Sequence, residues 1–376
     1  MVIKKLLAFF FFILIFFCLP IDYIWSQETQ EMETSLFQEE LLEGKVISLL
    51  DEKSMIRDGE KLLYQELEVR ISKGSLAGEK IKIEVGDIPI VGQPKYQVGD
   101  EVMISYSKDF EGKNIFIITD FIRRKPLVWL FLIFVVLALI VGQWRGGMSL
   151  LGLVISFAVI FLFILPQIYK GEDPIIIAIV GSLIIIPATF LLSHGLNRKT
   201  LVAMAGTLIA LLIVGLLSKF FIELTKLTGY ASEEAAFLHL ARRGQINIKG
   251  ILLAGIIIGT LGILDDITIS QAAIIQQLKK ANPKMKTKEL FLRAMDVGQD
   301  HIASMINTLV LVYTGAALPL MLLFIDNPRP FSEIINYQMI AEEIVRTLVG
   351  SVGLILAVPI TTILASKIAF RDRKQH

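Results

Sequence analysis

Residues 249–275 read KGILLAGIIIGTLGILDDITISQAAII and combine apolar and acidic residues in one run. From Gly250 to Leu264 the run holds only apolar residues, glycines and a single threonine. A helix of about 20 predominantly apolar residues crosses the hydrocarbon core of a bilayer. The run therefore predicts a membrane-spanning helix over about residues 250–272.

One face of this expected helix is small at one end and polar at the other. Small and polar residues recur three or four positions apart, the spacing of a single helix face, at Gly255, Gly259, Gly262, Asp266 and Ser270. Glycines in this pattern allow a neighbouring helix to approach closely. We therefore expect helix packing along the glycines and a polar site where they end.

Two adjacent acids, Asp265 and Asp266, lie inside the apolar run. Each costs about 2.5 kcal/mol at the centre of a bilayer, so both must face protein, water or a bound cation. Thr268 and Ser270 add hydroxyl groups nearby. These residues predict a binding site for an ion or solute. The alternatives are a span that stops at Leu264, leaving the acids at the interface, or a helix that is discontinuous there.

The composition agrees with a membrane protein. Hydrophobic residues make up 54% of the 376 residues and the mean hydropathy is +0.65, whereas a soluble domain is roughly 45–50% apolar. The net charge of +1 gives no reason to expect nucleic acid. The single cysteine, Cys18, excludes an intramolecular disulfide and a thiolate metal cluster. Four dispersed histidines and the absence of hydrolase, P-loop and Rossmann motifs predict a protein without metal centre, cofactor or enzymatic activity.

Apolar stretches of similar length recur along the chain. Each is close to the length that crosses a bilayer as a helix. Together they predict an all-α membrane bundle of about seven transmembrane helices within residues 123–370, with spans at about 127–143, 148–168, 174–192, 200–218, 250–272, 302–324 and 344–366.

The N-terminal part differs in composition. Residues 1–26 join Lys4 and Lys5 to a long apolar run, as a secretory signal peptide does, with an uncleaved anchor helix as the alternative. Residues 27–122 contain five runs of alternating apolar residues separated by Gly-bearing turns: GKVISLL, YQELEVRIS, KIKIEV, DEVMISYS and NIFIITD. They predict a small all-β domain resembling an OB barrel. Sparse aromatic residues argue against nucleic-acid binding there.

Basic residues near the span ends predict the orientation, because cytoplasmic loops are enriched in Lys and Arg. The segment 279–293 and the tail 371–376 are then cytoplasmic, and the β domain is extracytoplasmic. Arg123, Arg124 and Arg242 oppose this orientation, so the reversed topology is the alternative. We expect a multi-pass protein of the bacterial cell membrane.

Polar residues also mark the span at 302–324. Asp300 and His301 place an acid beside a group that titrates near neutrality, which predicts either proton handling or an ordinary helix start. Asn307 and Thr308 follow along the helix. Such side chains line a path or join helices by hydrogen bonds.

The last span carries one cation, Arg346, near its start. Its expected partner is a carboxylate on another helix or, alternatively, Glu342 or Glu343 on its own helix. Gly350 and Gly353 form another small face for helix packing.

Several of these segments resemble the bacterial YibE/F-like membrane protein family. The similar blocks are GTLGILDDITISQAA, GQDHIASMINTLVLVYTGAALPLMLL, EEIVRTLVGSVGLILAVPITT, GQWRGGMSLLGLVISF and LLSHGLNRKTLVAMAGTL, and the resemblance covers about residues 120–366. It implies a multi-pass membrane protein and assigns no activity.

Two functions fit these observations. The first is a secondary transporter or carrier for a small solute or ion, in which Asp265 and Asp266 bind a cation or proton and Asp300 and His301 act as coupling groups. The second is a membrane-anchored scaffold or signalling protein whose external β domain binds a protein partner. Other expected partners are the lipid bilayer, a small solute or cation and a second copy of the chain.

Overall fold

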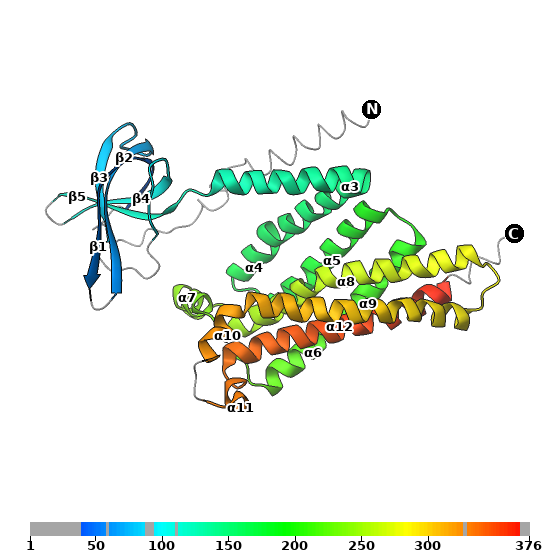
Figure 1. Ribbon diagram of the computed structural model, residues 1–376. Coiled ribbons are helices and arrows are strands. Elements are labelled where there is room, and N and C mark those ends of the chain that lie inside the picture. Colours follow the sequence, from blue (N-terminus) through cyan, green and yellow to red (C-terminus); the bar gives the residue numbers. More distant parts are fainter. Residues whose placement is uncertain (1–38, 58–59, 87–93, 110–111, 326–328, 369–376) are drawn as a thin grey trace. The chain divides into compact units, whose positions relative to one another are not determined.

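The computed structural model describes residues 39–57, 60–86, 94–109, 112–325 and 329–368 (Figure 1). The chain divides into two compact units near residue 137. The predicted signal peptide, residues 1–26, and the predicted tail, residues 371–376, lie outside the described residues.

The first unit contains a five-stranded antiparallel sheet. All five predicted strands are present, and the first two extend further than their sequence patterns indicated. They are β1 (Glu40–Arg57), β2 (Glu60–Lys73), β3 (Lys80–Val85), β4 (Glu101–Lys108) and β5 (Asn114–Phe121). The strand order is β3-β2-β1-β4-β5, so β1 pairs with both β2 and β4.

The sheet curls around its own hydrophobic core. Period-2 alternation turns alternate side chains to one face of each strand, and the buried set includes Leu42, Val46, Leu67, Val69 and Ile104. The two edge strands, β3 and β5, also contact each other. The sheet is therefore an antiparallel half-barrel.

Among the described residues, five helices are long and apolar enough to cross a bilayer. They are Arg124–Tyr169, α5 (Pro174–His194), α6 (Arg198–Leu224), α8 (Ile248–Ala281) and α12 (Gln338–Ile368). The first comprises α3 (Arg124–Val159), η1 (Ile160–Ile164) and α4 (Leu165–Tyr169). These five helices support the predicted helical membrane protein.

The predicted number of seven spans differs from these five for two reasons. The spans expected at 127–143 and 148–168 lie in the one 46-residue helix, which is kinked at Gln143, where φ is 50° and ψ is −133°. The span expected at 302–324 corresponds to α9 (Thr287–Ala316) and α10 (Leu318–Ile325). Because α9 begins in a charged stretch, it is not among the five apolar helices.

Side-chain caps fix where several helices begin. Asp173, Asn197 and Asn247 accept hydrogen bonds from first-turn N–H groups of α5, α6 and α8. Ser232 does the same for the short helix α7 (Glu233–Ala241). Such caps satisfy N–H groups that have no partner within the helix. Another short helix, α11 (Phe331–Ile334), precedes α12.

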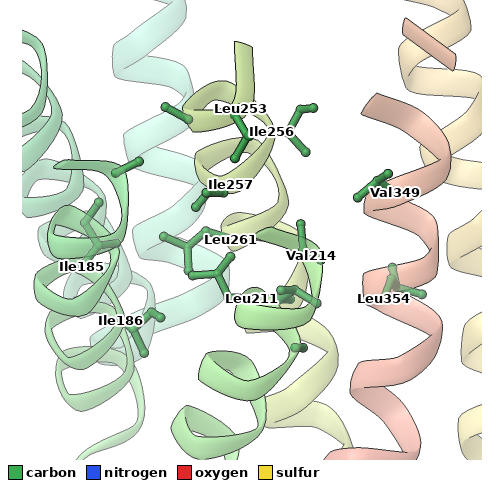
Figure 2. Close-up of a cluster of buried hydrophobic side chains, with 14 of the residues drawn as sticks. Ile185, Ile186, Leu211, Val214, Leu253, Ile256, Ile257, Leu261, Val349 and Leu354 are labelled. Carbon is green, nitrogen blue, oxygen red and sulfur yellow. The ribbon is translucent and has the colours of Figure 1, made fainter. Parts of the chain in front are cut away.

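The second unit is held together by apolar packing among α5, α6, α8 and α12. Figure 2 shows side chains of these helices interdigitating around α8, among them Ile186, Leu211, Ile257 and Leu354. The helix α9 packs on α8 and α12 (Figure 1). As a result, α8 contacts four other helices, α5, α6, α9 and α12.

Two glycines allow the closest approaches between helices. A Cβ atom on Gly353 of α12 would lie 2.1 Å from Val214 Cγ2 on α6. A Cβ atom on Gly206 of α6 would lie 2.3 Å from Thr361 Oγ1 on α12. The packing of α6 on α12 therefore requires glycine at both positions.

Candidate functional site

The helix α8 continues without a break past both acids. It runs from Ile248 to Ala281, so the span does not stop at Leu264 and is not discontinuous there. Neighbouring residues on this helix point about 100° apart, and Asp265 is partly buried while Asp266 is exposed. The two carboxylates therefore have different surroundings although they are adjacent in sequence.

Both acids line a cavity of about 690 Å³ between α3, α5 and α8. The wall on α8 includes Gly262, Asp265, Asp266 and Ser270. The other two helices contribute further polar side chains, which are Arg145, Ser149 and Ser156 on α3 and Thr189, Ser193 and His194 on α5. The cavity thus combines two carboxylates, several hydroxyls and two basic groups.

Asp265 is the most constrained group in this wall. Thr189 Oγ1 lies 3.2 Å from its Oδ2 and can donate a hydrogen bond to it. Its Oδ1 is buried and has no hydrogen-bond partner among the described residues. A buried carboxylate oxygen without a donor is costly unless a proton or cation neutralises it. The side chain is therefore placed to take up a positive charge.

Asp266 and Ser270 lie one turn apart and line the same cavity. No ion pair joins Asp266 to Arg145 or to any other cation in the described part of the chain. Carboxylate and hydroxyl oxygens are the ligands that hard cations prefer. The described residues contain no group of three His, Cys, Asp or Glu that could hold a metal ion.

Thr268, a predicted binding residue, does not line the cavity. It is fully buried, and its Oγ1 lies 2.7 Å from Thr207 Oγ1 on α6. This interhelical hydrogen bond joins α8 to α6. Thr268 therefore supports helix packing.

The polar residues of α9 are not brought to the cavity. Asp300, Asn307 and Thr308 are exposed and His301 is half-buried, and none of them lines the cavity beside Asp265. The opposite side of α9 packs through residues such as Gly298, where a Cβ would lie 2.7 Å from Val358 Cγ1 on α12. The stripe on α9 thus faces away from the two aspartates.

Arg346 lines a second cavity of about 440 Å³, together with Gly255, Glu342 and Glu343. Its Nε lies 3.5 Å from Glu343 Oε1, so its partner is on its own helix, as the alternative interpretation held. Glu342 is buried and accepts a hydrogen bond of 2.8 Å from Gln338 Nε2. This cavity also holds charged side chains, but it shares no lining residue with the first.

The glycine face of α8 is open rather than tightly packed. Gly255, Gly259 and Gly262 are exposed, and a Cβ atom on any of them would meet nothing closer than 3.7 Å. Gly350 on α12 is buried, but its Cβ would lie at an ordinary contact distance of 3.6 Å from Thr260 Oγ1. Of the glycines expected to pack helices, Gly353 alone makes a contact under 3 Å.

Sequence reasoning missed the cavity residues of α3 and α5. A signal was present, because Arg145, Ser149 and Ser156 are four and seven residues apart and so share one helix face. Thr189 and Ser193 have the same four-residue spacing. The spacing alone does not reveal that these faces meet at Asp265.

Long apolar helices packed around a cavity that two carboxylates line define an integral membrane protein of the helical-bundle class. The model of the YibE/F-like protein family matches residues 130–371. The chain therefore belongs to the YibE/F-like family, which confirms the resemblance seen in the sequence. Comparison with curated proteins and with solved structures found no match.

Proposed function

We propose that this YibE/F-like protein is a secondary transporter or carrier for a small solute or ion. In this proposal Asp265 and Asp266 bind a cation or proton, and Thr189 and Ser270 contribute oxygen ligands. The observation that carries it is the buried, unpartnered Oδ1 of Asp265 in the wall of a cavity. The proposal involves binding and passage and includes no enzymatic step.

The open glycine face of α8 supports a path to this site. Gly255 lines the cavity beside Arg346, Gly262 lines the cavity beside Asp266, and exposed Gly259 lies between them. From residue 255 to residue 266 the helix rises by about 16 Å, roughly half of a hydrocarbon core of about 30 Å. A solute that follows this face would move between the two cavities along bare backbone.

The proposed topology has seven spans in the bacterial cell membrane. The kink at Gln143 would divide the 46-residue helix into two spans, and α9 with α10 would supply another. Basic residues at 279–293 and in the C-terminal tail favour a cytoplasmic location for that end. Residues 27–122 would then be extracytoplasmic, following the signal peptide or anchor.

A scaffold or signalling function is the second candidate, and the β unit offers one observation in its favour. Leu41 on β1 and Ile117 on β5 both pair with Ser105 of β4, and they are 61% and 53% exposed. Cross-strand partners share a face of the sheet, so these two side chains form an exposed apolar strip. The strand order and the contact between β3 and β5 also fit a partly open OB-type barrel.

Flux measurement tests the transport proposal. Purified full-length protein is reconstituted in liposomes, and proton, Na⁺ and K⁺ movement is followed with candidate solutes present. We expect flux above that of empty vesicles, with most of it lost in Asp265→Asn and Asp266→Asn. Asp296→Asn is the matched control, because Asp296 is exposed on α9 and does not line the cavity. Wild-type flux equal to that of empty vesicles overturns the proposal.

Deleting residues 27–122 behind an intact signal separates the two candidates. A carrier retains Asp266-dependent flux after the deletion, provided that it reaches the membrane in normal amount. A scaffold loses its cellular phenotype on deletion and keeps it in Asp266→Asn.

A further inference from the structure

A third cavity, of about 230 Å³, lies where three helix ends meet. The helix α6 begins at Arg198, α8 ends at Ala281 and α12 is described to Ile368. The cavity is lined by residues from all three helices. It lies further along α8 than the cavity of Asp265 and shares no lining residue with it.

The lining has two chemically distinct parts. Four cations surround it: Arg198 and Lys199 at the start of α6, and Lys279 and Lys280 at the end of α8. Val202, Ala272, Ile275 and Ala365 form an apolar wall deeper along the same helices, and Ile368 adds an apolar side chain at the end of α12. No acidic residue occurs among the described lining residues. A charged mouth beside an apolar wall matches the two parts of an amphiphile.

The positive charges are positioned by the fold. Lys279 Nζ donates hydrogen bonds to the carbonyl oxygens of Pro283 and Met285, at 2.8 and 2.9 Å, so its ammonium group is held at the end of α8. Lys199 and Lys280 line this cavity from α6 and α8 respectively. Within the described residues, neither Lys199 nor Lys280 forms an ion pair with a carboxylate. The two like charges of Lys199 and Lys280 in one lining raise the local attraction for an anion.

We propose that this cavity binds the headgroup of an anionic phospholipid. Its phosphate lies among the four cations, and one acyl chain runs along the apolar wall. The apolar wall favours a lipid over free phosphate, since free phosphate gains nothing from Val202 and Ile275. The proposal is independent of transport at Asp265.

Measurement of lipid binding to the full-length protein in detergent tests the proposed phospholipid site. Native mass spectrometry measures the retention of phosphatidylglycerol and of phosphatidylcholine with the same chains, with inorganic phosphate as competitor. We expect preferential retention of phosphatidylglycerol that millimolar phosphate does not displace. The attraction of one basic residue to anionic lipids contributes about 1 kcal/mol, which corresponds to an about fivefold change in affinity. The double variant Lys199→Gln, Lys280→Gln should therefore lose about 25-fold in affinity.

The matched control is Lys284→Gln, Lys288→Gln, which removes the same charge from two exposed lysines outside the cavity lining. It should leave phosphatidylglycerol retention within about twofold of wild type. An equal loss in this control means general surface attraction and overturns the site. Equal retention of phosphatidylcholine, or displacement by phosphate at low concentration, overturns the lipid assignment. Melting temperature of each variant without lipid identifies loss caused by misfolding, and the single variant Lys280→Gln then replaces the double.

Discussion

Thr189 on α5 and Asp265 on α8 are joined by a hydrogen bond between residues 76 positions apart in the chain. The same hydroxyl lies 3.0 Å from Ile185 O and 3.1 Å from Ile186 O. Because a hydroxyl has one hydrogen, Thr189 donates to one of these three acceptors at a time. It can also accept a hydrogen bond from a protonated Asp265 while donating to its own helix. Thr189 is therefore suited to both charge states of the carboxyl group.

Thr189→Val should weaken cation binding at Asp265, because an oxygen ligand is lost, and should strengthen proton binding, because the carboxylate loses a donor that stabilises its charged form. Hydrogen bonds to charged groups contribute about 1.5–3 kcal/mol, so we expect apparent affinity to change by about tenfold or more. The measurement is the concentration dependence of flux in liposomes. Thr189→Ser keeps the hydroxyl and should behave as wild type. Unchanged affinity in Thr189→Val would show that this contact has no role in binding.

Substitution of an aspartate of α8 should lower transport flux more than substitution of Asp300 on α9. Asp266 lines the cavity, whereas Asp300 is exposed on α9 and lies outside it. We expect Asp266→Asn to abolish most flux and Asp300→Asn to change it by less than about twofold, at matched protein amount. A strong loss in Asp300→Asn would restore the coupling role that the sequence suggested for it.

Alanine substitution should lower the melting temperature at a glycine that contacts another helix and leave it unchanged at a glycine with space around it. A Cβ at Gly353 overlaps Val214 at 2.1 Å, while a Cβ at Gly262 meets nothing within 4 Å. Overpacking costs about 1–3 kcal/mol, so Gly353→Ala should lower the melting temperature in detergent by several degrees. Gly262→Ala should melt as wild type does, yet narrow the cavity beside Asp266. Equal melting of both variants would contradict the packing described.

In the β unit, Gln65 should be essential for holding the segment before β4. Its Oε1 accepts a 2.9 Å hydrogen bond from Tyr96 N, and its Nε2 donates a 3.0 Å hydrogen bond to Tyr96 O. Gln65→Leu leaves these buried backbone groups unpaired, at about 1–3 kcal/mol each. We expect faster amide exchange at Tyr96 and faster proteolysis there. The exposed Gln97→Leu serves as control.

High pH should destabilise the β unit through Tyr96. Burial, and then the charges of Asp120 and Asp100, raise the pKa of this phenol above its usual value of 10.0. A raised pKa in the folded state means that stability is fully present below pH 10 and is lost as pH rises through the folded pKa. Tyrosinate absorbance should show a late-titrating component that Tyr96→Phe removes. If that component persists in the variant, it arises from another tyrosine.

Local patterns in the sequence determined the elements and the family. Period-2 runs identified all five strands, because alternation expresses one buried face. Apolar length identified the membrane helices, because lipid requires every backbone group to bond within its own helix. The adjacent aspartates were found because charge inside an apolar run is costly wherever the helix packs.

Tertiary structure alone decided which polar faces meet. The spacing of Asp300 and Asn307 defines a stripe but not the direction it faces, and packing of α9 on α12 turned it outward. Thr268 on α8 forms a hydrogen bond with Thr207 on α6. Thr189, which contacts Asp265, lies on α5, a helix in which the sequence analysis identified no polar face. A helix fixes the angles between its own side chains, but its rotation about its axis is set by the neighbours it packs against.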